Sequence, residues 1–236
     1  MSRLAIFDLD NTLLSGDSEV LWVEYLLGRG LLDARLAAVN AEMDRRYRAG
    51  TATPAEFSSF YASTLAGRTA AEWQPVLAAF IDSCIRPRIP AAALDLVGRH
   101  RDRGDLLVLS TASSRFLSAP TAQLLGLAHL IATELQLDAA GRFTGATQGT
   151  LNMREGKRER LAQWLQARGN DVPAALATLA RATFYSDSIN DLPLLCAVGE
   201  AVVVDPDAQL RAQALARGWP VLALERAPFC LSTSTP

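Results

Sequence analysis

A short apolar run near the start of the chain, followed at once by two carboxylates, constrains the fold more than any other stretch. The run reads Leu4-Ala-Ile-Phe7, and Asp8 and Asp10 come directly after it, with Thr12 two positions later. Such a run is typical of a strand buried on both faces of a parallel sheet. Open α/β sheets bind their ligands at the carboxyl ends of such strands. The sequence therefore predicts a parallel sheet with a functional site at the end of its first strand.

The closeness of Asp8 and Asp10 creates a conflict of charge. Side chains alternate along an extended strand, so the two carboxylates would share a face if the strand continued. Two acids this close repel each other, and in apolar surroundings the pKa of at least one of them rises. A divalent cation removes the conflict because hard cations take oxygen ligands. The pair alone is compatible with a metal site and equally with two loop carboxylates without a function, and the later motifs decide between them.

Apolar runs and helical periodicity alternate through most of the chain. This alternation predicts an α/β fold, a doubly wound, Rossmann-like parallel sheet with right-handed crossovers. The predicted strands cover residues 4–7, 105–109, 130–137, 143–146, 182–185, 201–204 and 220–222.

One long stretch, residues 17–84, interrupts the alternation because it contains helical patterns only. Capping boxes that begin at Thr53 and Thr69 mark the starts of its third and fourth helices. Four helices with short joints can close a small bundle over a common core. The predicted parts are a core domain of residues 1–15 and 86–236 and an inserted α-helical cap domain of residues 16–85.

Composition and charge exclude several classes of protein. A formal net charge of −2 gives no basis for electrostatic capture of nucleic acid or of an anionic membrane. The first apolar run is too short for a signal peptide, and no segment reaches the length of a membrane span. Cys84, Cys196 and Cys230 form neither a disulfide framework nor a zinc spacing, which favours the reducing cytoplasm. We expect Cys196 to pack in an apolar helix, and His100 and His129 to lie on the surface.

Polar loops follow three of the predicted strands, at residues 8–12, 110–114 and 186–191, and Gly156-Lys157 begins a helix. The carboxyl ends of parallel strands lie at one edge of a sheet, so we expect these segments to meet. Together they offer what a phosphoryl group requires, namely a cation, a lysine, hydroxyl donors and free backbone N–H groups at helix starts. The sequence therefore predicts phosphate chemistry at this edge.

In chain order, these four segments resemble the four motifs of the haloacid dehalogenase superfamily, most of whose members are phosphatases. The first is Asp8-Leu-Asp10-Asn-Thr12, and the resemblance extends from residue 4 to about residue 222. The inserted helices resemble the C1-type cap of the subgroup that contains phosphoserine and histidinol phosphatases. The resemblance implies a Mg²⁺-dependent phosphatase that hydrolyses a small phosphomonoester metabolite through an aspartyl-phosphate intermediate.

The resemblance also implies the catalytic residues. Asp8 corresponds to the nucleophile that attacks phosphorus. Asp10 corresponds to the general acid/base, which protonates the leaving oxygen and then deprotonates the attacking water. Lys157 corresponds to the lysine that balances charge as the transition state forms. Phosphatases and sugar phosphomutases of the superfamily keep an acid in the place of Asp10, whereas its dehalogenases and ion-pumping ATPases lack one.

The resemblance further implies two sets of ligands, one for phosphate and one for Mg²⁺. The implied phosphate ligands are Ser110, Thr111 through its backbone N–H, and Asn190. The implied metal ligands are Asp8, Asp10 through its carbonyl, Asp187, and Asp191, the last as a residue that orients Lys157 or a metal-bound water.

The identity of the substrate is left open by the second motif and by the cap. Ser110-Thr-Ala stands where phosphoserine phosphatases usually have Ser-Gly-Gly. Asp17 stands nine residues after the first motif acid, where those enzymes place a glutamate that contacts the substrate's ammonium. N-capping of the first cap helix is the alternative for Asp17. Arg45, Arg46 and Arg48 form either a clamp for a substrate carboxylate or a charged outer face.

Alternatives remain open for the cap aromatics and for the activity. The aromatics are expected to form core rather than a substrate cage. They are Trp22, Tyr25, Phe57, Phe60, Tyr61 and Trp73. A phosphotransferase or mutase would use the same intermediate but exclude water, and a non-catalytic binding module is a third possibility. The predicted partner is a small phosphorylated metabolite, and neither nucleic acid nor a membrane.

Overall fold

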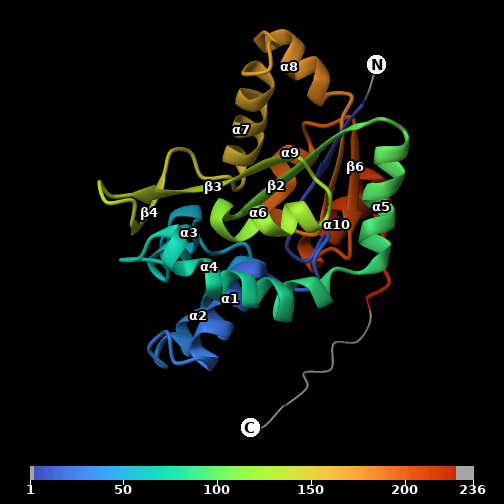
Figure 1. The fold of residues 1–236 in the computed structure, drawn as a ribbon. Helices are drawn as coiled ribbons and strands as arrows, with labels where there is room; N and C mark the ends of the chain where they lie inside the picture. The colour runs from blue at the N-terminus through green and yellow to red at the C-terminus, as the bar shows by residue number, and fades with distance from the viewer. Residues whose placement is uncertain (1–2, 227–236) are drawn as a thin grey trace.

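The computed structural model describes residues 3–226 and has a seven-stranded sheet at its centre (Figure 1). The strand order is β4-β3-β2-β1-β5-β6-β7, and neighbouring strands are parallel except for the antiparallel pair of β3 and β4. This topology confirms the predicted doubly wound α/β sheet. The strands are β1 (Leu4–Phe7), β2 (Leu106–Ser114), β3 (His129–Leu137), β4 (Phe143–Gln148), β5 (Thr183–Ser186), β6 (Glu200–Val204) and β7 (Val221–Leu222).

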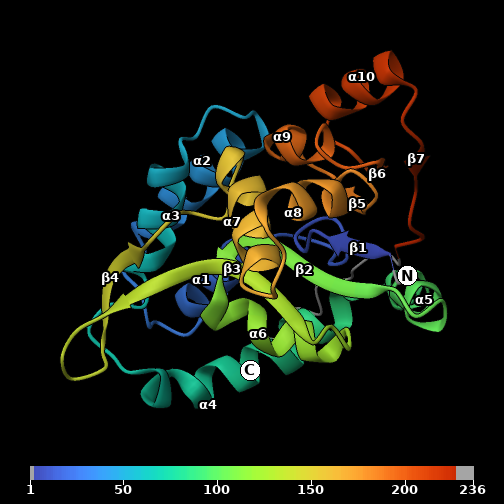
Figure 2. The same cartoon turned by 90° about the horizontal axis from the view of Figure 1, so that it is seen from above.

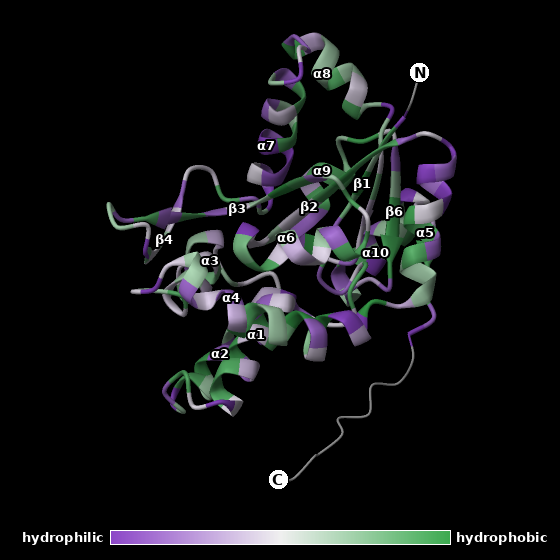
Figure 3. Cartoon of the chain, viewed as in Figure 1, coloured by the Kyte–Doolittle hydropathy of each residue, from purple (hydrophilic) through white to green (hydrophobic). Residues whose placement is uncertain are grey.

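Helices cover both faces of the sheet (Figure 2). One face carries α5 (Ala91–Asp102) and α6 (Arg115–Leu124), and the other carries α7 (Glu155–Gln166), α8 (Val172–Leu179), α9 (Leu192–Leu195) and α10 (Ala208–Arg217). Side chains alternate along β1, so Ala5 and Phe7 pack with α5 and α6, whereas Leu4 and Ile6 pack with the opposite layer. Figure 3 shows the result, in which apolar strands lie between helices with polar outer sides.

Four more helices lie between β1 and α5 in the chain and gather on one side of the molecule (Figure 1). They are α1 (Ser18–Gly28), α2 (Leu36–Arg48), α3 (Pro54–Ser63) and α4 (Ala70–Phe80). The capping boxes predicted at Thr53 and Thr69 are confirmed, because each threonine side chain accepts from the backbone N–H three residues on. A π-helical turn, Ile81–Ile85, and a 3₁₀ turn, Arg86–Arg88, return the chain to α5.

The inserted helices contribute aromatic side chains to a hydrophobic core that they share with β1, α5 and α6. Trp22 packs edge-to-face on Trp73 and Phe80, with ring centroids 5.6 and 5.1 Å apart. The predicted core aromatics are buried, except that Phe60 is half-buried. The division into core and cap domains stays a prediction, and we use the name cap for residues 16–85.

Three predictions about single residues and segments are wrong. His100 is buried, because Asp105 and Tyr185 offer partners at 2.8 Å to both of its ring nitrogens. Cys196 is exposed, because α9 is only four residues long and ends before it. Residues 110–114, expected as a loop, continue β2 beyond an irregularity in its pairing with β3. Cys230 lies outside the described residues.

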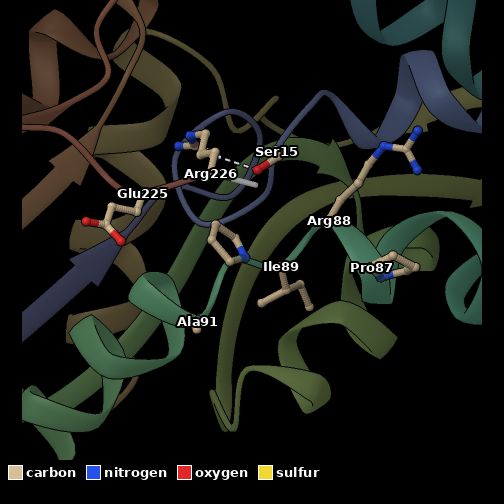
Figure 4. A pocket seen from close by; sticks show the side chains of 8 residues that line it. Ser15, Pro87, Arg88, Ile89, Ala91, Glu225 and Arg226 are labelled. Atoms are coloured by element: carbon tan, nitrogen blue, oxygen red, sulfur yellow. Dashed lines mark hydrogen bonds between the residues drawn. The ribbon is translucent and has the colours of Figure 1, made fainter. Parts of the chain in front are cut away.

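The two connections between cap and core line part of a half-open pocket of about 440 Å³ (Figure 4). Ser15 lines it from the first connection, and residues 87–91 line it from the second. Arg226 closes another side and donates to the carbonyls of Asn11 and Thr12 at 2.6 and 3.0 Å. This pocket therefore lies beside the two connections, and Arg226 fastens the loop that follows β1. Among residues 3–226, no helix combines the length and hydropathy needed to cross a bilayer.

Candidate active site

Three of the predicted site residues meet at the carboxyl end of β1. The Lys157 ammonium donates to Asp8 Oδ1 and to Asp191 Oδ2, each at 2.7 Å. Asp191 also accepts from the Ser186 hydroxyl at 2.7 Å, at the end of β5. Burial lowers the pKa of Lys157, but the charges of Asp191 and Asp8 outweigh it, so the pKa is raised overall. Lys157 is therefore a permanently charged cation, 1% exposed, between two carboxylates.

The start of α7 explains how Lys157 reaches this position. Gly156 lies so close to the carbonyl of Leu151 that a Cβ there would collide with its oxygen. Arg154, the residue before the helix, has φ 53°, in the region that favours glycine. The sequence contains one lysine, so the basic residues elsewhere in the chain are all arginines. Its isolation in the sequence was a signal for a special role.

Asp8 and Asp187 share the hydroxyl of Thr12. Thr12 Oγ1 lies 3.3 Å from Asp8 Oδ2 and 3.0 Å from Asp187 Oδ1, and it accepts from the Asp187 backbone N–H at 3.0 Å. Burial, together with the negative charges of Asp191 and Asp10, raises the pKa of Asp8 to about 7 despite Lys157. Burial and the charge of Asp8 likewise raise the pKa of Asp187.

This donor set fits Mg²⁺. The carboxylates of Asp8 and Asp187 repel each other across the Thr12 hydroxyl. Both are hard oxygen donors, and a divalent cation between them would offset their negative charge. Within residues 3–226, no group of three histidine, cysteine or acidic side chains is placed to hold a metal by itself. The carbonyl of Asp10 and water would have to complete the shell, which agrees with the habit of Mg²⁺ to keep several waters.

The Asp10 side chain is bound by residues of α1 and β2. Its Oδ1 accepts from the Ser18 backbone N–H at 2.7 Å, and its Oδ2 accepts from the hydroxyls of Ser113 and Thr111 at 2.6 and 3.3 Å. Both oxygens of the carboxylate are therefore bound by hydrogen-bond donors of α1 and β2. Ser113 was not predicted from the sequence, although alternation along a longer β2 would have placed it beside Thr111.

Ser110 lies at the same edge, next to a residue that was also not predicted. The buried Asn152 side chain donates to the Ser110 hydroxyl at 3.1 Å and to the carbonyls of Thr111 and Ile131 at 2.8 and 3.1 Å. Because the Ser110 oxygen accepts this bond, its own hydrogen is free to point at a phosphate oxygen. Asn152 lies in an irregular loop, where no periodic pattern marks it.

Asn190 binds the cap instead of joining the other predicted phosphate ligands. Its Nδ2 donates to the Tyr47 carbonyl at 3.1 Å, and Arg154 Nε donates to its Oδ1 at 3.1 Å. Arg154 Nη2 also donates to the carbonyls of Gly50 and Ala52, each at 2.8 Å. These bonds fasten the turn between α2 and α3 over the site.

Asp17 and the cap arginines make the structural contacts that were the alternatives to substrate binding, namely helix capping and ion pairs within the cap. The Asp17 side chain caps α1 by accepting from the backbone N–H groups of Glu19 and Val20 at 2.9 and 3.1 Å. Burial and the nearby Asp10 raise its pKa. The arginines pair within the cap, namely Arg45 with Glu42, Arg46 with Glu56 and Arg48 with Asp44.

The sequence model of the haloacid dehalogenase-like hydrolase family matches residues 5–195 of this chain. The chain belongs to that family. It is therefore a hydrolase by family, and the predicted superfamily membership is confirmed.

Two curated relatives of this hydrolase span almost its whole length. A histidinol-phosphatase of Neisseria meningitidis serogroup C (strain 8013) is 40% identical over 223 residues, which is 94% of this chain and 99% of the relative. The phosphoserine phosphatase SerB1 of Mycobacterium tuberculosis (strain ATCC 25618 / H37Rv) is 31% identical over 94% of this chain and 70% of its own.

Solved structures share the fold of the hydrolase. A protein of unknown function from Bordetella pertussis Tohama I aligns with a TM-score of 0.85 and 40% identity, over 94% of this chain and 98% of that one. A phospho-aspartyl intermediate analogue of phosphoserine phosphatase aligns with a TM-score of 0.69 and 15% identity, over 95% and 94% of the two chains. At that identity the second match supports the fold alone.

Proposed function

We propose that the protein is a Mg²⁺-dependent phosphatase that hydrolyses a small phosphomonoester through an aspartyl-phosphate intermediate. The observation that carries the proposal is the buried Asp8 carboxylate, which is bound by Lys157 and faces Asp187 across Thr12. A second acid, Asp10, is held two residues away. The names of the relatives, histidinol-phosphatase and phosphoserine phosphatase, support the same activity.

The first half-reaction forms the intermediate. A carboxylate oxygen of Asp8 attacks phosphorus, the bond from phosphorus to the ester oxygen breaks, and Asp10 gives its proton to the leaving alkoxide. Lys157 and the Ser110 hydroxyl offset the charge on the phosphoryl oxygens. Asp8, Asp187 and the Asp10 carbonyl would hold Mg²⁺, which supplies further positive charge.

The second half-reaction frees the nucleophile. Asp10, now ionised, takes a proton from a water molecule, whose oxygen attacks phosphorus. The bond between phosphorus and the Asp8 oxygen breaks, and inorganic phosphate leaves. Ser113, Thr111 and the Ser18 backbone N–H hold Asp10 in one orientation for both proton transfers.

The closed cap defines the conditions of this chemistry. Asp8 is 7% exposed and Asp10 is 9% exposed, so substrate cannot reach them until the cap moves. Closure removes bulk water and strengthens the electrostatic effect of Lys157. A small metabolite with an amine suits the acidic cap residue Asp17 and the name of the Neisseria relative. The free thiols Cys84 and Cys196 suit a cytoplasmic enzyme.

A phosphatase screen tests the proposal. The protein is incubated with Mg²⁺ and a panel of phosphorylated metabolites that includes histidinol phosphate and phosphoserine, and inorganic phosphate is measured. Asp8→Asn should abolish release, whereas Asp95→Asn, on the exposed side of α5, should not change it. Transfer of phosphate to an alcohol without release would show a phosphotransferase or mutase instead. Hydrolysis that persists in Asp8→Asn would contradict the mechanism.

A further inference from the structure

The cap places a row of three aromatic rings, in tilted and edge-to-face contact, against β2 and the loop before α7. The rings of Tyr47 and Phe57 lie 4.4 Å apart, and those of Phe57 and Tyr61 lie 4.7 Å apart. They share a packing cluster with Ala112 of β2 and with Met153 in the loop before α7. Ala112 stands between the two residues whose hydroxyls bind Asp10. The three rings therefore pack against β2 and the loop before α7, next in the chain to residues of the candidate site.

Two hydroxyls in this region are buried without a partner. Tyr61 Oη and Ser58 Oγ, which lie about one turn apart on α3, have no hydrogen bond to any of the described residues. Tyr61 is 2% exposed and Ser58 is 6% exposed. An unpaired buried hydroxyl is costly, so most such groups in native proteins bind something. Neither side chain pairs with the acids nearby, and both are free to take a ligand.

The electrostatic surroundings define what that ligand is. Burial and the negative charges of Asp17, Glu19 and Asp10 raise the pKa of Tyr61. Glu19 is buried as well, and its pKa is raised to about 7 by burial, against the hydrogen bond that it accepts from the Ser114 backbone N–H at 2.7 Å. Aromatic faces beside carboxylates favour a cation, because both offer negative potential.

We propose that Tyr61 and Ser58 bind the leaving group of the substrate and select an alcohol that carries a cationic nitrogen. The nitrogen donates its N–H groups to the Tyr61 and Ser58 oxygens, and the ring of Phe57 or Tyr61 contacts its apolar part. This inference deepens the proposed phosphatase function and rests on it for the position of the phosphate. It assigns to Tyr61 a role in specificity as well as in packing.

Removal of one hydroxyl tests the proposal. Tyr61→Phe keeps the ring and should raise the KM for histidinol phosphate about tenfold, the effect of one hydrogen bond to a charged group. The kcat/KM for 4-nitrophenyl phosphate, which has no amine, should stay within about twofold. Equal losses for the two phosphates, or no loss for either, would overturn the proposal.

Tyr25→Phe is the matched control. Tyr25 Oη is also buried in the cap without a partner, but it lies in the aromatic core around Trp22 and Phe80. We expect both substrates to be hydrolysed by Tyr25→Phe as by the unaltered enzyme. If its KM for histidinol phosphate rose as much as that of Tyr61→Phe, cap stability rather than ligand contact would be the cause.

The binding of histidinol without phosphate tests the proposed contacts of Tyr61 and Ser58 independently of the proposed phosphatase reaction. Calorimetry needs no phosphate and no turnover, so it reports on the leaving-group pocket even if the enzyme proves to be a mutase. The Kd of histidinol should be about tenfold higher for Tyr61→Phe than for Tyr25→Phe. Equal Kd values would overturn the proposal, whatever the phosphatase screen shows.

Discussion

Lys157 gives the most direct chemical test of the site at the scale of single residues. Its ammonium is buried and paired with Asp8 and Asp191, and its pKa is raised. Because a charged, buried amine is a poor nucleophile, acetylation of the native protein should modify the α-amino group and leave Lys157 untouched. Mass spectrometry should find that Lys157 is modified more than about 100-fold more slowly in the native protein than in urea.

The control for this labelling is built into the chain, since Lys157 is its one lysine. The α-amino group reports the activity of the reagent in the same molecule. Rapid modification of Lys157 under native conditions would contradict both its burial and its ion pairs.

Asp10 allows the two proton transfers to be separated from phosphate binding. Asp10→Asn keeps the shape of the side chain and a partner for Ser113 and the Ser18 backbone, so the fold should be retained. We expect kcat to fall by about 10²–10⁴-fold, because neither the leaving oxygen nor the water exchanges its proton. Inhibition by inorganic phosphate should stay near its original constant. Turnover close to that of the unaltered enzyme would refute the assignment of the acid/base.

At the scale of elements, the turn between α2 and α3 is one of several parts of the cap that bond to the core. Arg154→Ala removes the bonds to the Gly50 and Ala52 carbonyls and to Asn190. The closed state should then be less populated, and KM should rise about tenfold with a smaller change in kcat. Arg158→Ala, on the exposed side of α7, is the control and should leave KM unchanged. An unchanged KM in Arg154→Ala would show that this turn does not govern closure.

The backbone conformation of Arg154 allows a second test, in which thermal stability is measured instead of KM. Its φ of 53° and ψ of −127° are unfavourable for any residue but glycine. Arg154→Gly should therefore match Arg154→Ala in KM but exceed it in thermal stability. If the two variants melted at the same temperature, residue 154 would carry no backbone strain.

The same elements show why sequence predicted some of the site and not the rest. Asp8, Lys157 and Asp191 follow strands or begin helices, so periodicity and the edge rule of parallel sheets bring them together. Ser113 reaches the site because β2 extends to Ser114, and Asn152 reaches it because an irregular loop carries it to Ser110. No periodic pattern in the sequence marks either residue. The strands were predicted within a few residues, because their apolar runs are continuous. His100 was misplaced because its burial depends on partners from two other segments.

At the scale of the whole molecule, closure gathers acids whose pKa values are raised by burial, and this links stability to pH. The pKa values of Asp8 and Glu19 are about 7, and those of Asp17 and Asp187 are also raised. Between the unfolded pKa of about 4 and about 7, the folded protein therefore holds more protons than the unfolded chain. The free energy of unfolding should fall as the pH rises through this range.

Other titratable groups change the free energy of unfolding with the opposite sign or over a different range of pH. Backbone and side-chain hydrogen bonds lower the pKa of Glu56 to about 2, so its contribution is lost only as the pH falls from about 4 toward 2. His100 and His129 have pKa values lowered by burial, so they add stability as the pH rises toward about 6.5. The four raised carboxyl groups outnumber these two imidazoles, and the net slope should follow the carboxyl groups.

Magnesium should remove much of this pH dependence, because it binds the ionised carboxylates of the folded state alone. Urea unfolding in EDTA should give a lower free energy at about pH 8 than at about pH 5. Added Mg²⁺ should raise the value at pH 8 far more than at pH 5, where a proton already occupies Asp8. Glu19→Gln, which keeps an acceptor for the Ser114 backbone N–H, should flatten the slope in EDTA without altering the Mg²⁺ effect. A free energy that rises from pH 5 to pH 8 in EDTA would mean that the closed cap does not bury these acids in solution.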